Sequence, residues 1–431
     1  MKVNYKRVLI GAIFLYLVAS PVFGEYKFPP PEFDTNYLVP VMRTVPARAD
    51  WLVYLDIFIL IEVILLSAWA SLKRRSRNIV MLISMFSLLY FGFYKEGCIC
   101  PIGAVQDIVL SLTNPNYYLP FTAVLIFIIP LVASLFIGRA YCGGACPHGA
   151  LQDLLLLKEI KIPRWLDRSL SMLAYIYLGL AVLFALTDSV FLICKYDPFV
   201  PIFRLTGPFY MLLNGGFFVL LSLFIGRPYC RFLCPYGALL KPLALVSREK
   251  VTITPDKCIV CKLCEDSCPF GAINKPDKPE RRKAKNRLVV LGLFISGLIA
   301  GGVLGNYTGA LLATYNRDVK LAVEIYAYSE GEPEKIILSD YAKEYIRTGE
   351  SSLLLYEKVA GVKNKFKTGG IYLGVWIMFV MGLQFLYAAR KPKRDIYEPD
   401  SARCMSCARC FRDCPIERQE KSTGDGSRKQ E

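Results

Sequence analysis

Long apolar runs, separated by short polar and charged segments, dominate the chain. Runs of roughly twenty residues match the hydrocarbon core of a bilayer, about 30 Å thick. We therefore predict membrane-crossing helices at Trp51–Leu72, Ile79–Tyr94, Leu119–Ile137, Leu170–Leu186, Phe209–Ile225, Leu288–Leu304 and Ile371–Ala389. A further run, Val8–Val22, follows Lys2, Lys6 and Arg7 and is either a cleaved signal peptide or a retained first helix. The pattern predicts an all-α membrane protein with about eight transmembrane helices.

Composition and charge support this prediction. Of the 431 residues 54% are hydrophobic, and the mean hydropathy is +0.38. A formal charge of +16 can also indicate a nucleic-acid-binding protein. The basic residues, however, concentrate in alternate loops such as 73–77 and 390–394, as the positive-inside rule predicts for cytoplasmic loops. The pattern therefore favours a multi-pass protein of a prokaryotic cell (inner) membrane over one that binds nucleic acid.

The polar segments divide the chain into parts with different expected roles. These are a signal peptide or first helix plus outer segment at 1–50, a six-span-type membrane core at 51–247, a first cysteine-rich segment at 248–286, a transmembrane helix at 287–305, an extracytoplasmic domain at 306–368, a returning transmembrane helix at 370–389, and a second cysteine-rich segment with a basic tail at 390–431. The extracytoplasmic domain is predicted to be a small α+β unit. Alternating apolar and polar residues predict a strand at Lys320–Tyr328, and a helix is predicted near Ser339–Thr348.

The two cysteine-rich segments carry the same motif. The first contains Cys258, Cys261, Cys264 and Cys268 before Pro269, and the second contains Cys404, Cys407, Cys410 and Cys414 before Pro415. Three cysteines at two-residue gaps, followed by a fourth before proline, have the spacing that wraps a cubane iron–sulfur cluster. Zinc sites favour two separated CxxC knuckles instead. We therefore predict a split, cytoplasmic, ferredoxin-like head that holds two [4Fe–4S] clusters.

Further cysteines recur in three similar segments. The pairs are Cys98 and Cys100, Cys142 and Cys146, and Cys230 and Cys234, and the second member of each precedes a proline. A degenerate fourth segment has Cys194, with Asp197 before Pro198. Repeats spaced one helix apart must alternate between the membrane faces. We therefore expect two pseudo-symmetric helix-pair repeats, with Cys98, Cys100 and Cys194 at the outer face and Cys142, Cys146, Cys230 and Cys234 at the inner face.

The number of ligands differs between the two faces. The four inner cysteines suffice for a further [4Fe–4S] or [2Fe–2S] cluster. The outer three are one ligand short unless Asp197, water or a partner completes the site, so copper, a disulfide or plain packing are alternatives there. Because His148 is the single histidine, bis-histidine haem is excluded, and we expect His148 to be a surface residue or a residue that supports a nearby metal ligand rather than a ligand itself. Residues 196–199 can shape a quinone pocket or belong to the aromatic belt.

These motifs resemble those of the NapH/NosR polyferredoxin-type membrane proteins. The resemblance covers residues 51–275 and the final motif, and is carried by Cys142-x3-Cys146-Pro, Cys230-x3-Cys234-Pro-Tyr-Gly-Ala and Cys268-Pro-Phe-Gly-Ala-Ile. Members of that family link the quinol pool or a cytoplasmic reductant to periplasmic reductases, or assist the maturation of such enzymes. NosR-type members carry a large N-terminal flavin domain where this sequence has residues 1–50. Their ferredoxin motifs usually follow one another directly, whereas here a helical hairpin and an outer domain separate them.

The hairpin returns the chain to the cytoplasm, where the two ferredoxin halves can join. In bacterial ferredoxins the fourth cysteine of each motif ligates the other cluster. We therefore predict one cluster on Cys258, Cys261, Cys264 and Cys414, and the other on Cys404, Cys407, Cys410 and Cys268.

Taken together, these features predict a membrane-bound iron–sulfur electron-transfer protein. It would relay electrons between a cytoplasmic reductant or the quinol pool and an extracytoplasmic redox partner, with redox proteins docking on both sides and the basic inner face suited to an acidic one. No acid–base pair or nucleophile emerges, so no catalytic residue is assigned and a partner is expected to do the bond chemistry. The main alternative is a maturation or metal-reducing factor for a periplasmic metalloenzyme. A transporter is disfavoured because Glu62 stands alone as a mid-helix ionisable residue.

Overall fold

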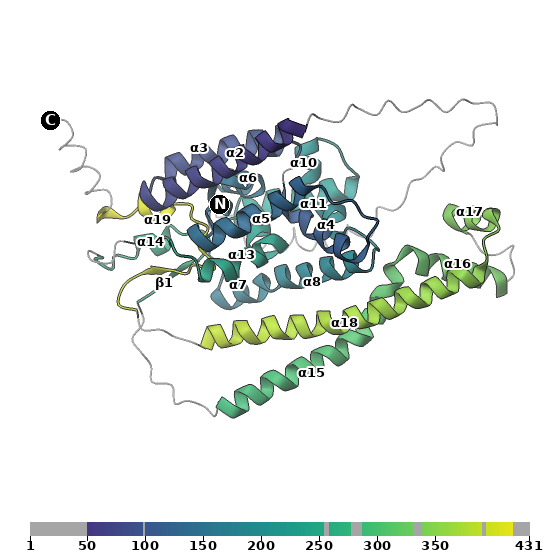
Figure 1. Ribbon diagram of the computed structural model, residues 1–431. Helices are drawn as coiled ribbons and strands as arrows, with labels where there is room; N and C mark the ends of the chain where they lie inside the picture. The colour runs from purple at the N-terminus through teal and green to yellow at the C-terminus, as the bar shows by residue number, and fades with distance from the viewer. Residues whose placement is uncertain are drawn as a thin grey trace, which may run out of the picture.

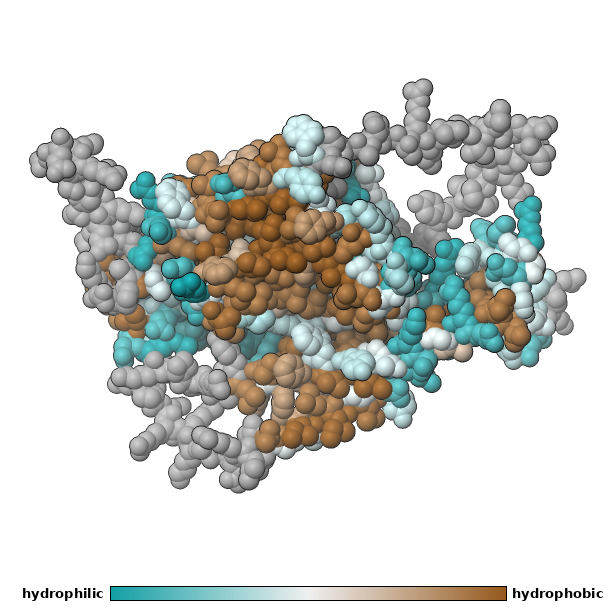
Figure 2. All heavy atoms as spheres, viewed as in Figure 1, coloured by the Kyte–Doolittle hydropathy of each residue, from teal (hydrophilic) through white to brown (hydrophobic). Residues whose placement is uncertain are grey.

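The computed structural model describes residues 50–97, 100–253, 258–276, 287–330, 338–389 and 394–416. These residues form a bundle of helices, a long helical hairpin beside it, and a small head at one end where the two cysteine-rich segments meet (Figure 1). Figure 2 shows a broad hydrophobic surface over the bundle and hairpin, with hydrophilic residues gathered toward both ends. This surface pattern fits helices that cross a bilayer, because lipid-facing side chains must be apolar. We call the end of the bundle that carries the head the head end.

Two antiparallel helical segments line one side of the bundle. Helix α2 (Asp50–Ala68) continues through η1 (Trp69–Lys73), and α3 (Arg77–Ser87) continues through η2 (Leu88–Tyr94). Buried serine hydroxyls on both segments donate to the loop that carries Cys142 and Cys146. Ser67 donates to the carbonyl of Ala140, Ser84 to that of Gly143 and Ser87 to that of Ala145. Small polar side chains of this kind hold helices and loops together where no water is present.

Five helical segments are long and apolar enough to cross a membrane: Trp51–Lys73, Arg77–Tyr94, Arg164–Leu186, Leu291–Tyr315 and Ser352–Leu386. The third comprises α7 (Arg164–Ser171) and α8 (Leu173–Leu186). Two of the predicted spans are shorter: α5 (Phe121–Ile137) has 17 residues and α11 (Phe209–Ser222) has 14. Helix α5 ends where Gly138 takes a φ of +62°, a conformation that glycine adopts readily. The count of five candidate spans holds for the described residues only, and the eighth predicted run, 8–22, lies outside them.

Short helices fill the interior between the long ones. Helices α4 (Pro101–Thr113), α6 (Pro147–Leu154) and α13 (Pro235–Leu245) each begin with a proline directly after a cysteine. The preceding cysteine is extended and proline is favoured at the first helical position, so each Cys-Pro pair fixes where its helix begins. Four further short elements accompany them: η3 (Tyr141–Ala145), α9 (Leu192–Tyr196), α10 (Val200–Arg204) and α12 (Pro228–Phe232).

The hairpin consists of α15 (Arg287–Leu312) and α18 (Ser352–Ala389), which lie side by side below the bundle in Figure 1. Glycines let the two backbones approach closely. A Cβ atom added at Gly305 or Gly309 of α15 would overlap Gly370 or Phe366, and one at Gly374 of α18 would overlap the carbonyl oxygen of Gly301. Small residues at such spacing are the usual basis of close helix packing in membranes.

The segment at the far end of the hairpin is helical throughout its described part. Helix α15 continues through η5 (Ala313–Tyr315) into α16 (Arg317–Glu330), and α17 (Asp340–Thr348) precedes α18. The predicted strand at Lys320–Tyr328 is therefore wrong, whereas the helix predicted near Ser339–Thr348 is confirmed as α17. The apolar alternation was misleading because Val319, Ala322 and Ile325 form the buried helical stripe, while Val323 is exposed.

Helix α18 also changes the predicted extent of the outer domain. The helix begins at Ser352, within the segment 306–368 that was expected to form a separate α+β unit. With 38 residues it is roughly 57 Å long at 1.5 Å per residue, well beyond the bilayer core. Leu355 and Val359 of α18 pack against the stripe on α16. The far end is therefore a helical cap built on the hairpin rather than a distinct domain.

Replacing Gly374 with alanine is expected to destabilise the hairpin. The new Cβ must push Gly301 away, and overpacking of this kind typically costs about 1–3 kcal/mol. Gly361 on the same helix provides the control, because a Cβ added there has no atom within 4 Å. Thermal unfolding of the detergent-solubilised full chain should show a lower midpoint for Gly374→Ala and an unchanged or higher midpoint for Gly361→Ala. Equal midpoints for the two variants would contradict the close packing.

Candidate metal centres

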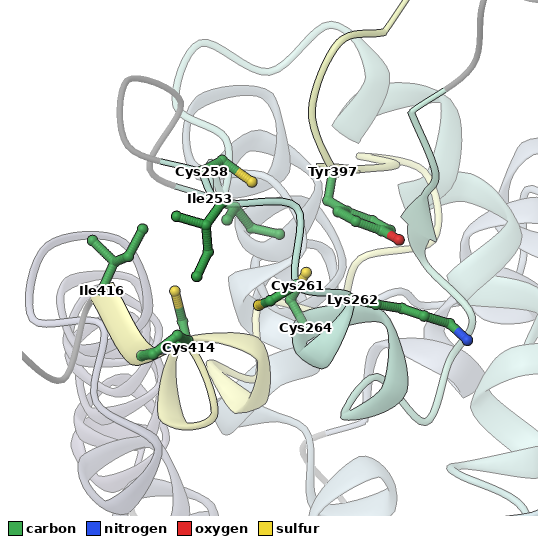
Figure 3. A pocket seen from close by; sticks show the side chains of 10 residues that line it. Ile253, Cys258, Cys261, Lys262, Cys264, Tyr397, Cys414 and Ile416 are labelled. Atoms are coloured by element: carbon green, nitrogen blue, oxygen red, sulfur yellow. The ribbon is translucent and has the colours of Figure 1, made fainter.

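Four thiols of the head face one pocket. Cys258, Cys261 and Cys264 come from the first motif and Cys414 from the second, and Figure 3 shows their sulfur atoms around a common space. The Lys262 side chain points away from that space, so its ammonium does not enter it. The space enclosed by this pocket, its open mouth included, is about 360 Å³. We call it the outer head pocket, because Cys261 is exposed to solvent.

The other four motif cysteines line a second pocket. Cys404, Cys407 and Cys410 share it with Cys268 from the first motif, and none of the four is exposed. Its volume of about 370 Å³ matches that of the outer head pocket, which suits two copies of the same group. We call it the inner head pocket. The structure thus brings together the same two sets of four cysteines that the sequence predicts.

Both motifs curl around their pockets with the same unusual backbone. The residues on either side of the second cysteine have positive φ angles: Val260 at 54° and Lys262 at 71°, then Ser406 at 50° and Ala408 at 59°. None of them is glycine, and left-handed backbone costs such residues roughly 1–2 kcal/mol each. Strain of this kind persists where the surroundings impose it, and left-handed turns can point successive backbone N–H groups toward an anion.

Short elements join the two halves of the head. Strand β1 (Ile273–Asn274) pairs antiparallel with β2 (Glu398–Pro399), and helix α14 (Leu263–Asp266) packs against α19 (Arg409–Arg412). The backbone N–H of Asp400 also donates to the carbonyl of Ala272 at 2.7 Å. Segments separated by the whole hairpin therefore form one head.

Four membrane cysteines form a buried group inside the bundle. Cys230 lies within electrostatic range of Cys142, Cys146 and Cys234. Three of the thiols accept hydrogen bonds: Cys230 from Nε2 of Gln152 at 3.2 Å, Cys234 from the backbone of Gly237 at 3.3 Å, and Cys142 from Nη2 of Arg139 at 3.7 Å. The sequence predicted that these four residues share a site, and the structure places them together.

The depth of this group follows from its contacts with α3. Arg77, at the start of that helix, donates to the carbonyl of Cys407 in the head, and Ser87 donates to the carbonyl of Ala145 beside Cys146. Ten residues of helix separate the two contacts, which is about 15 Å. The segment from Arg77 to Tyr94 has 18 residues, roughly 27 Å. The membrane cysteines therefore lie near the middle of the bundle rather than at its surface.

Cys100 lies beside this group and not at the opposite face. Its thiol is within electrostatic range of Cys146 and Cys234, which were expected at the other membrane face, so the prediction for Cys100 is wrong. The reason is that the first residues of α4, Pro101 and Ile102, are buried, so this helix of 13 residues begins inside the bundle and not at a surface. Such re-entrant backbone is tolerated where protein surrounds it.

The other cysteines predicted at the outer face do not join this group. Cys194 is exposed, and its sulfur would lie 3.5 Å from a Cβ added at Gly103, one turn along α4 from Cys100. Cys98 lies outside the described residues. The predicted outer set of three is therefore not assembled in the described part of the chain.

His148 and Asp197 lie together next to the membrane cysteines. His148 Nε2 is 3.7 Å from Asp197 Oδ2, and Asp197 Oδ1 accepts from the backbone N–H of Phe199 at 2.8 Å. The imidazole packs edge-on against Phe199 and Phe203, and neither ring nitrogen has a hydrogen-bond partner in the described structure. Of the predicted quinone segment 196–199, Asp197 and Phe199 are buried and only Tyr196 is exposed.

A carboxylate at the contact between head and bundle, which we call the junction, holds three arginines. Asp153 on α6 binds Arg77 at 2.5 Å, Arg227 at 3.2 Å and Arg409 of the head at 2.9 Å. Burial raises the pKa of Asp153, but the guanidinium groups of Arg227, Arg77 and Arg409 outweigh it and hold that pKa well below its usual range. The carboxylate is therefore charged at neutral pH and ties α3, the second membrane repeat and the head together.

A second carboxylate makes a similar clamp. Asp167 on α7 binds Arg231 at 2.6 Å and Arg403 of the head at 2.9 Å. The backbones also come close, because a Cβ added at Gly143 would lie 2.7 Å from the carbonyl oxygen of Met405. The inner head pocket therefore packs directly on the loop that carries Cys142.

Sequence reasoning missed the buried arginines of the junction. Arg139 donates to the carbonyl of Ala402 at 3.1 Å and Arg227 to that of Gly143 at 3.1 Å. Both are fully buried, and each follows a glycine and precedes x-Tyr-Cys in its repeat. That extension of the cysteine repeat, Gly-Arg-x-Tyr-Cys, was the signal that could have identified them.

The spacing of the thiols suits a polynuclear group. Among the residues that the structure describes, no three His, Cys, Asp or Glu side chains are close enough to hold a single metal ion. The four corners of a cubane stand further apart than the ligands of one ion, so sets of four converging thiols remain suited to clusters. Burial raises the pKa of Cys268 to about 11 and that of Cys404 to about 12, so these residues are thiols until a metal replaces the proton.

Comparisons with known proteins agree with this chemistry. One family model described as a 4Fe-4S binding domain matches residues 97–117, 119–170 and 206–254, and a second with the same description matches residues 251–274. The first model spans the membrane cysteine repeats and the second spans the first ferredoxin motif. No solved structure matches the chain.

Two curated relatives are similar over part of their length. The "Putative electron transport protein YccM" of Escherichia coli (strain K12) is 31% identical over 122 residues, which is 26% of this chain and 34% of that protein. The "Uncharacterized protein MJ0750" of Methanocaldococcus jannaschii is 30% identical over 185 residues, which is 42% of this chain and 77% of that protein. The chain thus spans about a third of YccM and about three quarters of MJ0750.

Replacing Asp153 with asparagine is expected to loosen the head from the bundle. The change leaves the buried guanidinium groups of Arg77 and Arg227, and the partly exposed one of Arg409, without their carboxylate, and breaking a buried pair costs about 3–5 kcal/mol. Hydrogen exchange of the backbone amides in 394–416 should report this loss as faster exchange. The control is Asp266→Asn, which removes an exposed pair with Lys161 and should leave exchange in that segment unchanged.

Comparison of the wild-type protein with Asp153→Asn also tests how the stability of the head depends on pH. Because the pKa of Asp153 is lowered in the folded chain, its contribution is complete above the ordinary value of 3.8 and is lost as the pH falls toward the lower native value. The difference in head stability between wild type and Asp153→Asn, measured by hydrogen exchange in 394–416, should therefore be constant near neutral pH and become smaller below pH 3.8. A difference that grew in acid would contradict the clamp.

Proposed function

The chain belongs to the same family as MJ0750 of Methanocaldococcus jannaschii, and we propose that this iron–sulfur electron-transport protein relays electrons from one side of a membrane toward the other. Its reductant would be a cytoplasmic redox protein or the quinol pool, and its acceptor an extracytoplasmic redox partner. The observation that carries the proposal is the direct contact between the inner head pocket and the membrane cysteine loop at Gly143 and Met405. Two sites of the same ligand chemistry in contact form a path rather than separate sites.

The head would hold two [4Fe–4S] clusters. Cys258, Cys261, Cys264 and Cys414 would ligate one, and Cys404, Cys407, Cys410 and Cys268 the other. Such clusters supply a site that gains and loses one electron at a time without bond chemistry. The residues fit the group, because four thiols face each pocket and the left-handed backbone wraps them in the same way in both motifs.

The buried thiols in the bundle would hold a third cluster, either [4Fe–4S] or [2Fe–2S]. Cys142, Cys146, Cys230 and Cys234 are the proposed ligands, and Cys100 lies against the same group on the side of α4. We retain Cys98 and Cys194 as candidate ligands of a metal toward the far end, since the first lies outside the described residues and the second is exposed. Protein encloses the group, so water is excluded from the middle of the path.

The head is proposed to face the cytoplasm. The segments 73–77 and 390–394 are basic in sequence, and the second directly precedes the head segment 394–416, which favours the cytoplasmic side. The outer head pocket has one exposed cysteine, Cys261, so it is the point where a soluble redox protein can approach a ligand most closely. The likeness of the cysteine motifs to the NapH/NosR polyferredoxin type supports the same orientation, with the chemical acceptor outside.

Alanine substitutions of single cysteines should separate the two head clusters. Cys414→Ala and Cys258→Ala are expected to remove the same electron paramagnetic resonance signal, although the residues belong to different motifs, because both line the outer head pocket. Cys268→Ala should remove the other signal. Iron and sulfide counting on the purified full chain should give about twelve iron atoms in the wild type for three cubanes, and about four fewer in each variant. Ser267→Ala, between Cys264 and Cys268, is the matched control and should keep all iron. Loss of the same signal in Cys268→Ala and Cys258→Ala would contradict the proposed grouping.

Continuous turnover distinguishes an electron conduit from a maturation factor. The full chain reconstituted in vesicles, with its head outward and an electron acceptor dye trapped inside, should reduce many dye molecules per chain when dithionite is added outside. A factor that acts once during assembly of another enzyme would reduce about one equivalent of dye per cluster and stop. Cys146→Ala should abolish the steady rate while both head signals remain, because Cys146 is a ligand only in the bundle.

A further inference from the structure

Two buried arginines lie between the head and the membrane cysteines, and the proposed electron path gives them no role. Arg139 and Arg227 are 2% and 0% exposed. They occupy the same position in the two membrane repeats, three residues before Cys142 and Cys230. An arginine is costly to bury unless opposite charge or hydrogen bonds compensate it. The nature of that compensation indicates what these residues do.

Arg139 has no carboxylate partner among the described residues. Its Nη1 donates to the carbonyl of Ala402 in the head at 3.1 Å, and its Nη2 lies 3.7 Å from Sγ of Cys142 in the bundle. Its Nε is buried without a partner. Three cysteines lie within its electrostatic range, Cys142 and Cys234 of the bundle and Cys404 of the head, and these would be anionic thiolates as cluster ligands.

Arg227 makes an equivalent bridge. It donates to the carbonyls of Cys142 and Gly143 in the bundle and stacks over the ring of Phe270 in the head, 5.7 Å from its centroid. It lies within electrostatic range of Cys230 and of Cys407, one ligand from each side. Its carboxylate partner, Asp153, is shared with two other arginines, so the junction carries more positive than negative charge.

We propose that Arg139 and Arg227 are the counter-ions of the two iron–sulfur groups that meet at the junction, and that they raise the reduction potentials of those groups above that of the outer head pocket. This rests on the proposed function, because it assumes that the inner head pocket and the membrane cysteines hold clusters. Both residues act as positioning residues, since they work through the charge they place beside the thiolates.

The physical reason is the charge that arrives with an electron. A reduced cluster carries one more negative charge than an oxidised one, and in a buried site that charge interacts strongly with a nearby cation. Positive charge and hydrogen bonds to ligand sulfur are among the factors that set cluster potentials. The outer head pocket has neither arginine beside it.

The arrangement gives the path a direction. Electrons donated to the outer head pocket would move to groups of higher potential at the junction, which is downhill toward the membrane interior. The two arginines therefore give two similar pockets different reduction potentials, with the higher potential toward the membrane interior. A structural role alone, in which the arginines only hold the loop carbonyls, predicts no such selective effect on potentials.

The test is a redox titration of the full chain in detergent, poised with dithionite and ferricyanide and followed by electron paramagnetic resonance. Arg139→Gln should shift both junction signals to lower potential, so that at a fixed poise the ratio of reduced to oxidised cluster falls at least tenfold, which is 59 mV for a one-electron couple. The outer head signal, identified by its loss in Cys258→Ala, should not shift. Arg139→Lys keeps the charge and should recover part of the shift. Arg168→Gln, which removes an exposed positive charge from α7, is the control and should leave all signals unchanged.

Two results would overturn the proposal. The first is an Arg139→Gln protein with full iron content and unshifted potentials, or with all signals shifted equally. The second is loss of junction iron in both Arg139→Gln and Arg139→Lys, which would assign the guanidinium to holding the loops. Failure of the proposed function is distinct, because it would appear as missing iron already in the wild-type chain.

Discussion

The ion pairs of Asp153 and Asp167 are the constraint on which the arrangement of the molecule depends. Each carboxylate binds one arginine of the head and at least one of the bundle, and both are buried. The strands of the head have two residues each and its helices four, and its Ala408 and Phe411 pack against Ala70 and Val80 of the bundle. Segments this small cannot bury enough apolar surface to fold alone. The head therefore takes its structure from the bundle beneath it and from the groups that its thiols bind.

The strained loops of the head show how groups bound by its thiols can contribute to its stability. Four residues of positive φ surround the two pockets, and Val260 is β-branched, which makes its left-handed conformation especially unfavourable. In the absence of a ligand nothing on the loops themselves repays that cost. Metal binding supplies free energy only in the folded geometry, so binding and folding of such loops are coupled. Under the proposed function the same coupling would join the two distant halves of the head, because each cluster would take ligands from both halves.

The features that the sequence predicts well are those set by local spacing. The spacing of the cysteines in the two ferredoxin motifs predicts which four cysteines line each head pocket, and the apolar runs predict the long helices. Both predictions depend on neighbouring residues only. The position of Cys100 could not be predicted this way, since counting one membrane crossing per cysteine loop assumes that each loop reaches a surface, and α4 begins inside the bundle instead. Arg227 of the junction was missed, because its pairing with Asp153 and with the carbonyl of Gly143 is entirely tertiary.

The depth of the membrane thiols determines what a partner must supply. They lie about 15 Å from the head end of α3, and about 12 Å of that helical segment remains beyond them. Cys100 and then Cys194, near Gly103 one turn along α4, continue from the group in the direction of that remaining distance. Cys194 is exposed, whereas Asp197 and Phe199 beside it are closed to solvent. The chain thus brings its buried redox ligands about halfway across and offers one accessible thiol beyond them. Under the proposed function, an electron acceptor would therefore approach the bundle at α9, where Cys194 lies.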